Sequence, residues 1–315
     1  MRTSSTLLFG LSLSFLLACG DSGSGGQGGT GGGEGGTAPE GGGGGSVGGS
    51  PSTGGGDTGG APVECEAPTP MPGDKVDVPV ETVTISAKDE TGSPISDTPL
   101  QLCGTNGCLY ATTSAIGQAL FTNNLSSDTI DRPLVKPGDS LVFGKIGYHY
   151  TEGAASPFPV TFPRMEDSGE QITAGGTVSA SGVTLEVGAN AHVTFDSLIY
   201  DTEDKQTFRA AQLPAELIEA ATGDASFSMV YTLGPVDTLF CDDTVTVTFD
   251  NYADLPADAT VDIFGHELAI GEEFGPYGEW TKIAEGKVSA DGTTITTAGE
   301  GLPVLLTVAI RAQGQ

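Results

Sequence analysis

Most of the chain after residue 74 consists of short segments in which apolar and polar residues alternate, as they do in half-buried β-strands. VETVTISAKD at 80–89 and DTVTVTFDN at 243–251 show this pattern, and the Asp291-Gly292 pair is a strong hairpin signal. Only LPAELIEAAT at 213–222 favours a short helix, because Pro214 precedes strong helix formers. The pattern therefore predicts an all-β fold made of two antiparallel β-sandwich domains, at 74–155 and 156–315.

The stretch at 20–62 cannot add to a β-sandwich core. It holds 23 of the protein's 49 glycines and otherwise mostly Ser, Thr, Pro and four acids, with no base. Glycine loses more backbone entropy on ordering than any other residue, and here no apolar side chains offset that loss. The strict period of an ordered glycine-rich helix is absent. We expect a disordered Gly-rich linker over 19–73, of which residues 20–62 would span roughly 35–40 Å as a random coil.

The first 18 residues have the build of an export signal. Arg2 is the only charge before a run of apolar and small residues at 7–18, which is shorter than the roughly 20 residues of a membrane-spanning helix. The segment Leu-Leu-Ala-Cys at 16–19 resembles the lipobox of bacterial lipoproteins. That resemblance implies a signal peptide at 1–18 and a mature chain that begins with an acylated Cys19. The alternative is an ordinary secretory signal followed by a chance cysteine.

The charge of the chain excludes one class of partner. It carries 41 acids against 12 bases, a formal net charge of -29. Nucleic-acid binding depends on Lys and Arg contacts to phosphates, so we expect no nucleic-acid partner. The acids are spread along the chain, as on a solvated surface.

The cysteines predict disulfides once Cys19 is set aside as the lipidation site. The remaining four are even in number and follow an export signal, which favours pairing. Cys103 and Cys108 flank turn residues in LQLCGTNGCLYAT, so we expect a hairpin cross-linked near its loop. Cys65 and Cys241 then remain for each other, although four cysteines allow three connectivities.

Residues 74–155 resemble the carboxypeptidase regulatory-like domain, a transthyretin-like β-sandwich. The matching positions, in chain order, are Asp89, Gly92, Pro94, Ile95, Thr113, Gly117, Pro137, Gly138, Asp139, Gly147 and Tyr148. The chain departs from that pattern at Ala115-Ile116, where family members more often carry acids. The resemblance implies an accessory domain that spaces or stabilises others and brings no catalytic residues.

The C-terminal half resembles the β-sandwich domain shared by zona-occludens-type and netrin-receptor proteins. The segments that carry this likeness are LPADATVDIFGHE, GEWTKIAEGKVSADGTTITT with Trp280, and GEGLPVLLTVAI. The resemblance implies a second sandwich at 156–315.

No motif of catalysis or metal binding is found in the sequence. The three histidines lack a partner at helical spacing, and we expect His266 at the surface or at a hairpin end and Trp280 in the core. The serine-nucleophile elbow and the phosphate-binding loop are also absent. DTEDK at 201–205 and CDDT at 241–244 offer oxygen ligands but follow no known calcium loop, so solvated loops are expected. We therefore predict no catalytic residue, no metal site and no cofactor.

Together these features predict a lipid-anchored bacterial surface protein without enzymatic activity, acting as a binding, spacing or envelope-interaction module. Its expected partners are a membrane, through the lipid on Cys19, and an unidentified protein or polysaccharide. We expect it in the bacterial cell envelope, in the outer membrane. The alternatives are an exported hydrolase with an unrecognised site and a calcium-dependent adhesin.

Overall fold

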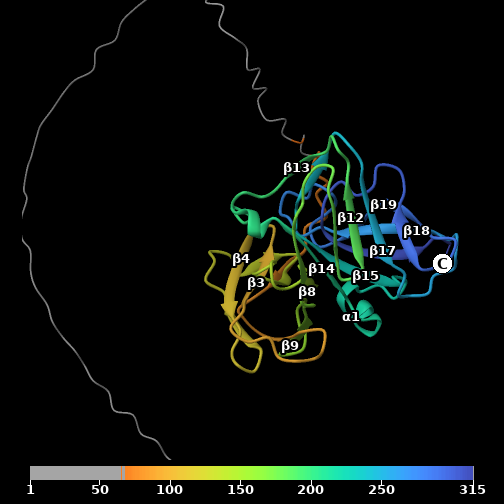
Figure 1. Ribbon diagram of the computed structural model, residues 1–315. Coiled ribbons are helices and arrows are strands. Elements are labelled where there is room, and N and C mark those ends of the chain that lie inside the picture. Colours follow the sequence, from red (N-terminus) through yellow and green to blue (C-terminus); the bar gives the residue numbers. More distant parts are fainter. Residues whose placement is uncertain (1–64, 66–67, 315) are drawn as a thin grey trace, which may run out of the picture. The chain divides into compact units, whose positions relative to one another are not determined.

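The computed structural model describes residue 65 and residues 68–314 (Figure 1). The expected signal peptide, Cys19 and most of the linker lie outside these residues. In the described part, helices are too short and too polar to cross a bilayer.

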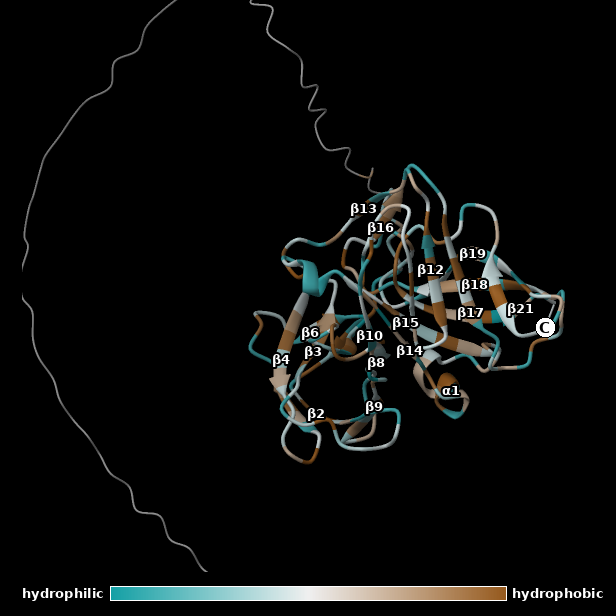
Figure 2. Cartoon of the chain, in the orientation of Figure 1, coloured by the Kyte–Doolittle hydropathy of each residue, from teal (hydrophilic) through white to brown (hydrophobic). Residues whose placement is uncertain are grey.

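The largest sheet has ten strands in the order β10-β14-β15-β21-β18-β19-β20-β17-β12-β11. Their bounds are β10 Glu166–Gln171, β14 Thr207–Gln212, β15 Met229–Gly234, β21 Thr307–Ala312, β18 Thr260–His266, β19 Trp280–Val288, β20 Thr294–Thr297, β17 Val245–Asp250, β12 Val183–Val187 and β11 Thr177–Ala180. Hydrophobic and hydrophilic residues alternate along β12 and β17 (Figure 2). One core contains Val178 from β11 together with Phe208 from β14, near opposite ends of the strand order. The sheet therefore folds over onto itself and packs as a sandwich.

A second sandwich is built from two smaller sheets. One has the order β5-β2-β9, with β5 Gln118–Thr122, β2 Thr82–Lys88 and β9 Phe158–Thr161; the other has the order β4-β3-β7-β8, with β4 Gly107–Thr112, β3 Pro99–Gly104, β7 Leu134–Pro137 and β8 Tyr148–His149. Ile85 and Phe121 from the first sheet share a core with Leu102 and Val135 from the second. This is the sandwich nearer the N-terminus.

Short elements complete the described chain. Two small sheets pair β1 Asp77–Pro79 with β6 Thr129–Asp131, and β13 His192–Thr194 with β16 Leu239–Cys241; the helical elements are η1 Glu203–Lys205, η2 Ala215–Leu217 and α1 Ile218–Thr222. The expected helix at 213–222 is thus one 3-10 turn followed by α1. It ends at Gly223, whose left-handed conformation (φ 71°) suits glycine. The fold is all-β, as predicted.

Strand pairing and packing both cross the expected division at residue 155. The strand β9 lies beyond it and pairs with β2, in the one parallel pairing between named strands of the described chain. Leu213, Ile218 and Ala309 also pack in the core of the N-terminal sandwich. The two sandwiches therefore bury apolar side chains against each other. The expected domain boundary between residues 155 and 156 stays a prediction.

Candidate functional site

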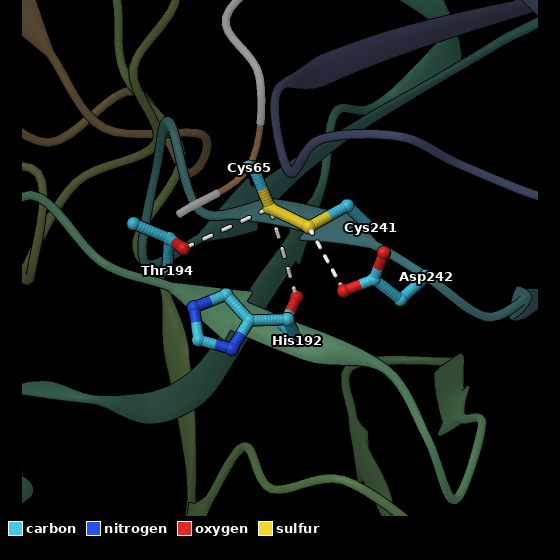
Figure 3. Close-up of a disulfide and its surroundings, with 5 residues drawn as sticks. All are labelled: Cys65, His192, Thr194, Cys241 and Asp242. Carbon is cyan, nitrogen blue, oxygen red and sulfur yellow. Dashed lines mark hydrogen bonds between the residues drawn. A yellow bond between two sulfur atoms is a disulfide. The ribbon is translucent and has the colours of Figure 1, made fainter. Parts of the chain in front are cut away.

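The first residue that the structure describes, Cys65, lies within the expected linker at 19–73, near its C-terminal end, and forms a disulfide with Cys241 (Figure 3). Cys241 ends β16 and pairs in register with His192 of β13. The Cys65 Sγ lies 3.8 Å from Thr194 Oγ1 and 3.9 Å from the His192 carbonyl oxygen. A disulfide sulfur carries no proton, so the Thr194 hydroxyl is the donor to it. The bond joins positions 176 residues apart and fixes residue 65 to the C-terminal sandwich.

The second disulfide joins Cys103 and Cys108, which face each other in the β3–β4 ladder with Cα atoms 4.1 Å apart. Of the three connectivities that the sequence allowed, the structure therefore has the one that pairs neighbours across the hairpin and leaves Cys65 to Cys241. All four cysteines of the described chain are paired, so none of them is a free thiol.

Residues 68–79, which we call the strap, run from the disulfide across both sandwiches. The Met71 amide donates to the Glu272 carbonyl oxygen at 2.8 Å, and the Val76 amide donates to Asp131 Oδ1 at 2.7 Å. A Cβ at Gly73 would lie 2.6 Å from Arg132 Nη1, closer than real contacts allow. Glycine at this position lets the strap lie directly against the side chain of Arg132.

Below the strap lies a buried ion cluster. Arg132 contacts Glu272 Oε1 at 2.8 Å and Asp131 Oδ2 at 3.4 Å, and each of the three side chains is about nine-tenths buried. Burial raises the pKa of Glu272, but hydrogen bonds from the Tyr277 amide and from Arg132 outweigh this and hold the pKa below its usual value. The cluster joins the strap, the N-terminal sandwich and the β18–β19 loop. Arg132 and Glu272 lie 140 positions apart, and no local pattern in the sequence predicts their pairing.

A second buried cation, Lys136 on β7, lacks a carboxylate partner. Its Nζ donates to the Leu268 carbonyl oxygen at 3.0 Å and lies 5.3 Å from the centre of the Tyr277 ring. Burial, and then the nearby charge of Lys145, lower the pKa of Lys136 to about 8. Lys145 differs because its Nζ has a partner, Asp237 Oδ2, at 2.9 Å.

Of the two positions expected for His266, the surface is wrong and the hairpin end is confirmed, because His266 ends β18 and pairs with Trp280 of β19. Its side chain is 1% exposed, stacks on Trp280 with ring centres 4.3 Å apart, and is partnered through Nε2 by the Gly278 carbonyl oxygen at 3.2 Å. His149 Nε2 lies 3.0 Å from the same oxygen. Burial lowers the pKa of His266 to about 3, so the ring is neutral at physiological pH. Glu267 is buried too, because β18 ends at His266 and the strand alternation ends with it.

The two acidic segments weighed as calcium sites have protein partners instead. Asp201 pairs with Lys205 at 2.7 Å, and Asp243 accepts from the Asn190 amide at 3.1 Å. Within residue 65 and residues 68–314, no three His, Cys, Asp or Glu side chains are grouped as metal ligands. A hollow of about 700 Å³ lies beside Cys241, with Asp242 and Glu300 among its lining residues.

No family model, curated protein or solved structure matches the chain. The resemblances to the carboxypeptidase regulatory-like domain and to the zona-occludens and netrin-receptor sandwich therefore stay predictions.

Proposed function

We propose that this protein is a lipid-anchored, non-enzymatic module of the bacterial envelope, in which a β-sandwich head is held away from the outer membrane by a glycine-rich linker. The observation that supports this most is the position of the Cys65–Cys241 disulfide. It lies near the C-terminal end of the expected linker at 19–73, where the described chain begins. An anchored protein needs its head fixed firmly at that point, and a covalent bond to the C-terminal sandwich provides this.

The head is strongly acidic, so we expect an anionic envelope surface to repel it. Residues 68–314 contain 35 acids and only 11 bases. Nine of these bases form ion pairs with acids; they are Lys75, Arg132, Lys145, Arg164, Lys205, Arg209, Lys282, Lys287 and Arg311. Few cations are then left for phosphate groups of lipid or nucleic acid. We expect the partner to be a protein or polysaccharide that tolerates a strongly acidic surface.

The buried ionisable groups support a structural role for the head. Arg132 and Glu272 bond to each other, and His149 and His266 each have the Gly278 carbonyl oxygen as a partner. A catalytic acid, base or nucleophile has to reach a substrate, whereas these groups bond to the protein itself.

Metabolic labelling with palmitate tests the anchor. The wild-type protein should incorporate label and sediment with membranes, and Cys19→Ala should do neither. The matched control is Cys65→Ala, which removes a cysteine from the head and should leave labelling unchanged. Equal labelling of wild type and Cys19→Ala would refute the proposal.

Two further assays separate the alternatives. An exported hydrolase would turn over a peptide, ester or glycoside substrate and lose that turnover on substitution of one acid. A calcium-dependent adhesin would melt at a higher temperature in millimolar calcium than in chelator. We expect neither turnover nor a melting shift.

A further inference from the structure

The Cys65–Cys241 disulfide divides the described chain into a part inside the loop that the bond closes and a part outside it. Residues 66–240 lie inside the loop that the bond closes, and this loop contains the whole N-terminal sandwich. Residues 242–314, with β17 to β21, lie outside it. A pull that enters at residue 65 and leaves at the C-terminus has a covalent route that omits the loop.

We propose that this disulfide is a load bypass, which passes tension in the linker from Cys65 directly to Cys241 and leaves residues 66–240 unstretched. The inference rests on the proposed function, because it takes the part of the expected linker before Cys65 to be a tether. It goes further by giving the disulfide a mechanical role beside its structural one.

Without the Cys65–Cys241 disulfide, the strap would carry the tension in the linker. Tension would then reach residues 68–79 first, where β1 is held to β6 by a ladder of only three residue pairs. Beyond this ladder the strap has a few hydrogen bonds, such as those to Glu272 and Asp131. A pull from the chain end loads these bonds one after another, so the strap would peel away and uncover the Arg132 ion cluster.

The route through Cys241 meets a stronger element. The next strand after it is β17, which is paired with β12 on one side and β20 on the other. Val245, Val247 and Phe249 of β17 are at most 1% exposed. Tension therefore enters an interior strand of the ten-stranded sheet rather than β1, which is three residues long and pairs only with β6.

Magnetic tweezers can test the bypass on the mature chain, residues 19–315, produced without acylation. Cys19 is then the single free thiol for a maleimide-linked DNA handle, and the second handle is attached through a tag after Gln315. Fully unfolding the oxidised protein should release only the chain beyond Cys241, a gain of about 250 Å at full extension. Cys65→Ser/Cys241→Ser should release roughly 600 Å more, because the 176 positions between the two cysteines become extensible.

The force of the first step decides whether the bypass protects the head. In the double variant we expect an early step of at most about 50 Å, from the strap, at a force below the first unfolding force of the oxidised protein. Cys103→Ser/Cys108→Ser is the matched control and should behave like wild type. If the double variant does not fold, the same comparison can be made by adding reductant to folded wild type.

Two results would overturn the proposal. One is the longer release from the oxidised wild type, and the other is an equal first unfolding force with and without the disulfide. Palmitate labelling is independent of both, so a failed anchor and a failed bypass can be told apart.

Discussion

Replacing Lys136 by methionine should stabilise the protein at neutral pH. The lysine is 6% exposed, and its ammonium group has one protein acceptor, the Leu268 carbonyl oxygen, and no carboxylate partner. Its pKa is about 8 in the folded state, against about 10.4 in an unfolded chain. Each unit of difference is worth about 1.4 kcal/mol, so keeping Lys136 charged at pH 7 costs the fold about 3 kcal/mol.

The sign of the pH dependence follows from this difference. Between pH 8 and about 10 the unfolded chain holds the Lys136 proton and the folded protein does not, so the free energy of unfolding rises with pH. Above pH 10 the trend reverses, because burial raises the pKa of Tyr148, Tyr231 and Tyr277, and these ionise more readily when unfolded. Lys136→Met loses one hydrogen bond, worth about 1 kcal/mol, and should gain about 2 kcal/mol net at pH 7.

Urea unfolding from pH 6 to pH 10, followed by the fluorescence of Trp280, measures this directly. The single tryptophan packs on Phe227 with ring centres 5.6 Å apart and should report loss of the core. Lys88→Met is the matched control, because Lys88 is exposed and its substitution should leave stability unchanged. If Lys136→Met keeps the wild-type rise between pH 8 and 10, the burial argument for Lys136 is wrong.

Three other substitutions give distinct outcomes. Cys65→Ser/Cys241→Ser should lower the free energy of unfolding by up to about 5 kcal/mol in the chain-entropy model, against about 2 kcal/mol for removal of the other disulfide, and urea titrations compare the two. Glu272→Ala leaves Arg132 buried beside a single carboxylate and should cost about 3–5 kcal/mol in thermal unfolding, while the neighbouring Glu273→Ala should cost under 1 kcal/mol. His266→Phe should flatten the acid side of the stability curve. His266 should account for a loss of about 4–5 kcal/mol in wild type between pH 6.5 and pH 3, because the unfolded histidine binds a proton that the folded ring, with a pKa of about 3, does not.

The strand content could be predicted because it depends on neighbouring residues. Val245, Val247 and Phe249 alternate with threonines, and the structure buries the three apolar side chains in β17. The hairpin at Asp291-Gly292 is confirmed for a similar local reason, since Gly292 adopts a left-handed conformation (φ 76°) that glycine allows.

The junction between the sandwiches could not be predicted, because its partners are far apart in the chain. Arg132 meets Glu272 across 140 positions, and nothing within a strand length of either residue signals the pair. The burial of His266 was missed for a related reason. Alternation tells which face of a strand a residue occupies, but the packing of the β18–β19 loop over that strand end decides whether water reaches the face.

Mass spectrometry of the N-terminal peptide from protein purified out of the membrane fraction tests the central claim most directly. We predict that the mature chain begins at Cys19 and carries a diacylglyceryl thioether on its sulfur, with no residue of the 1–18 segment attached. A chain that begins elsewhere, or that carries an unmodified Cys19, would contradict the proposal that this protein is a lipid-anchored module of the envelope.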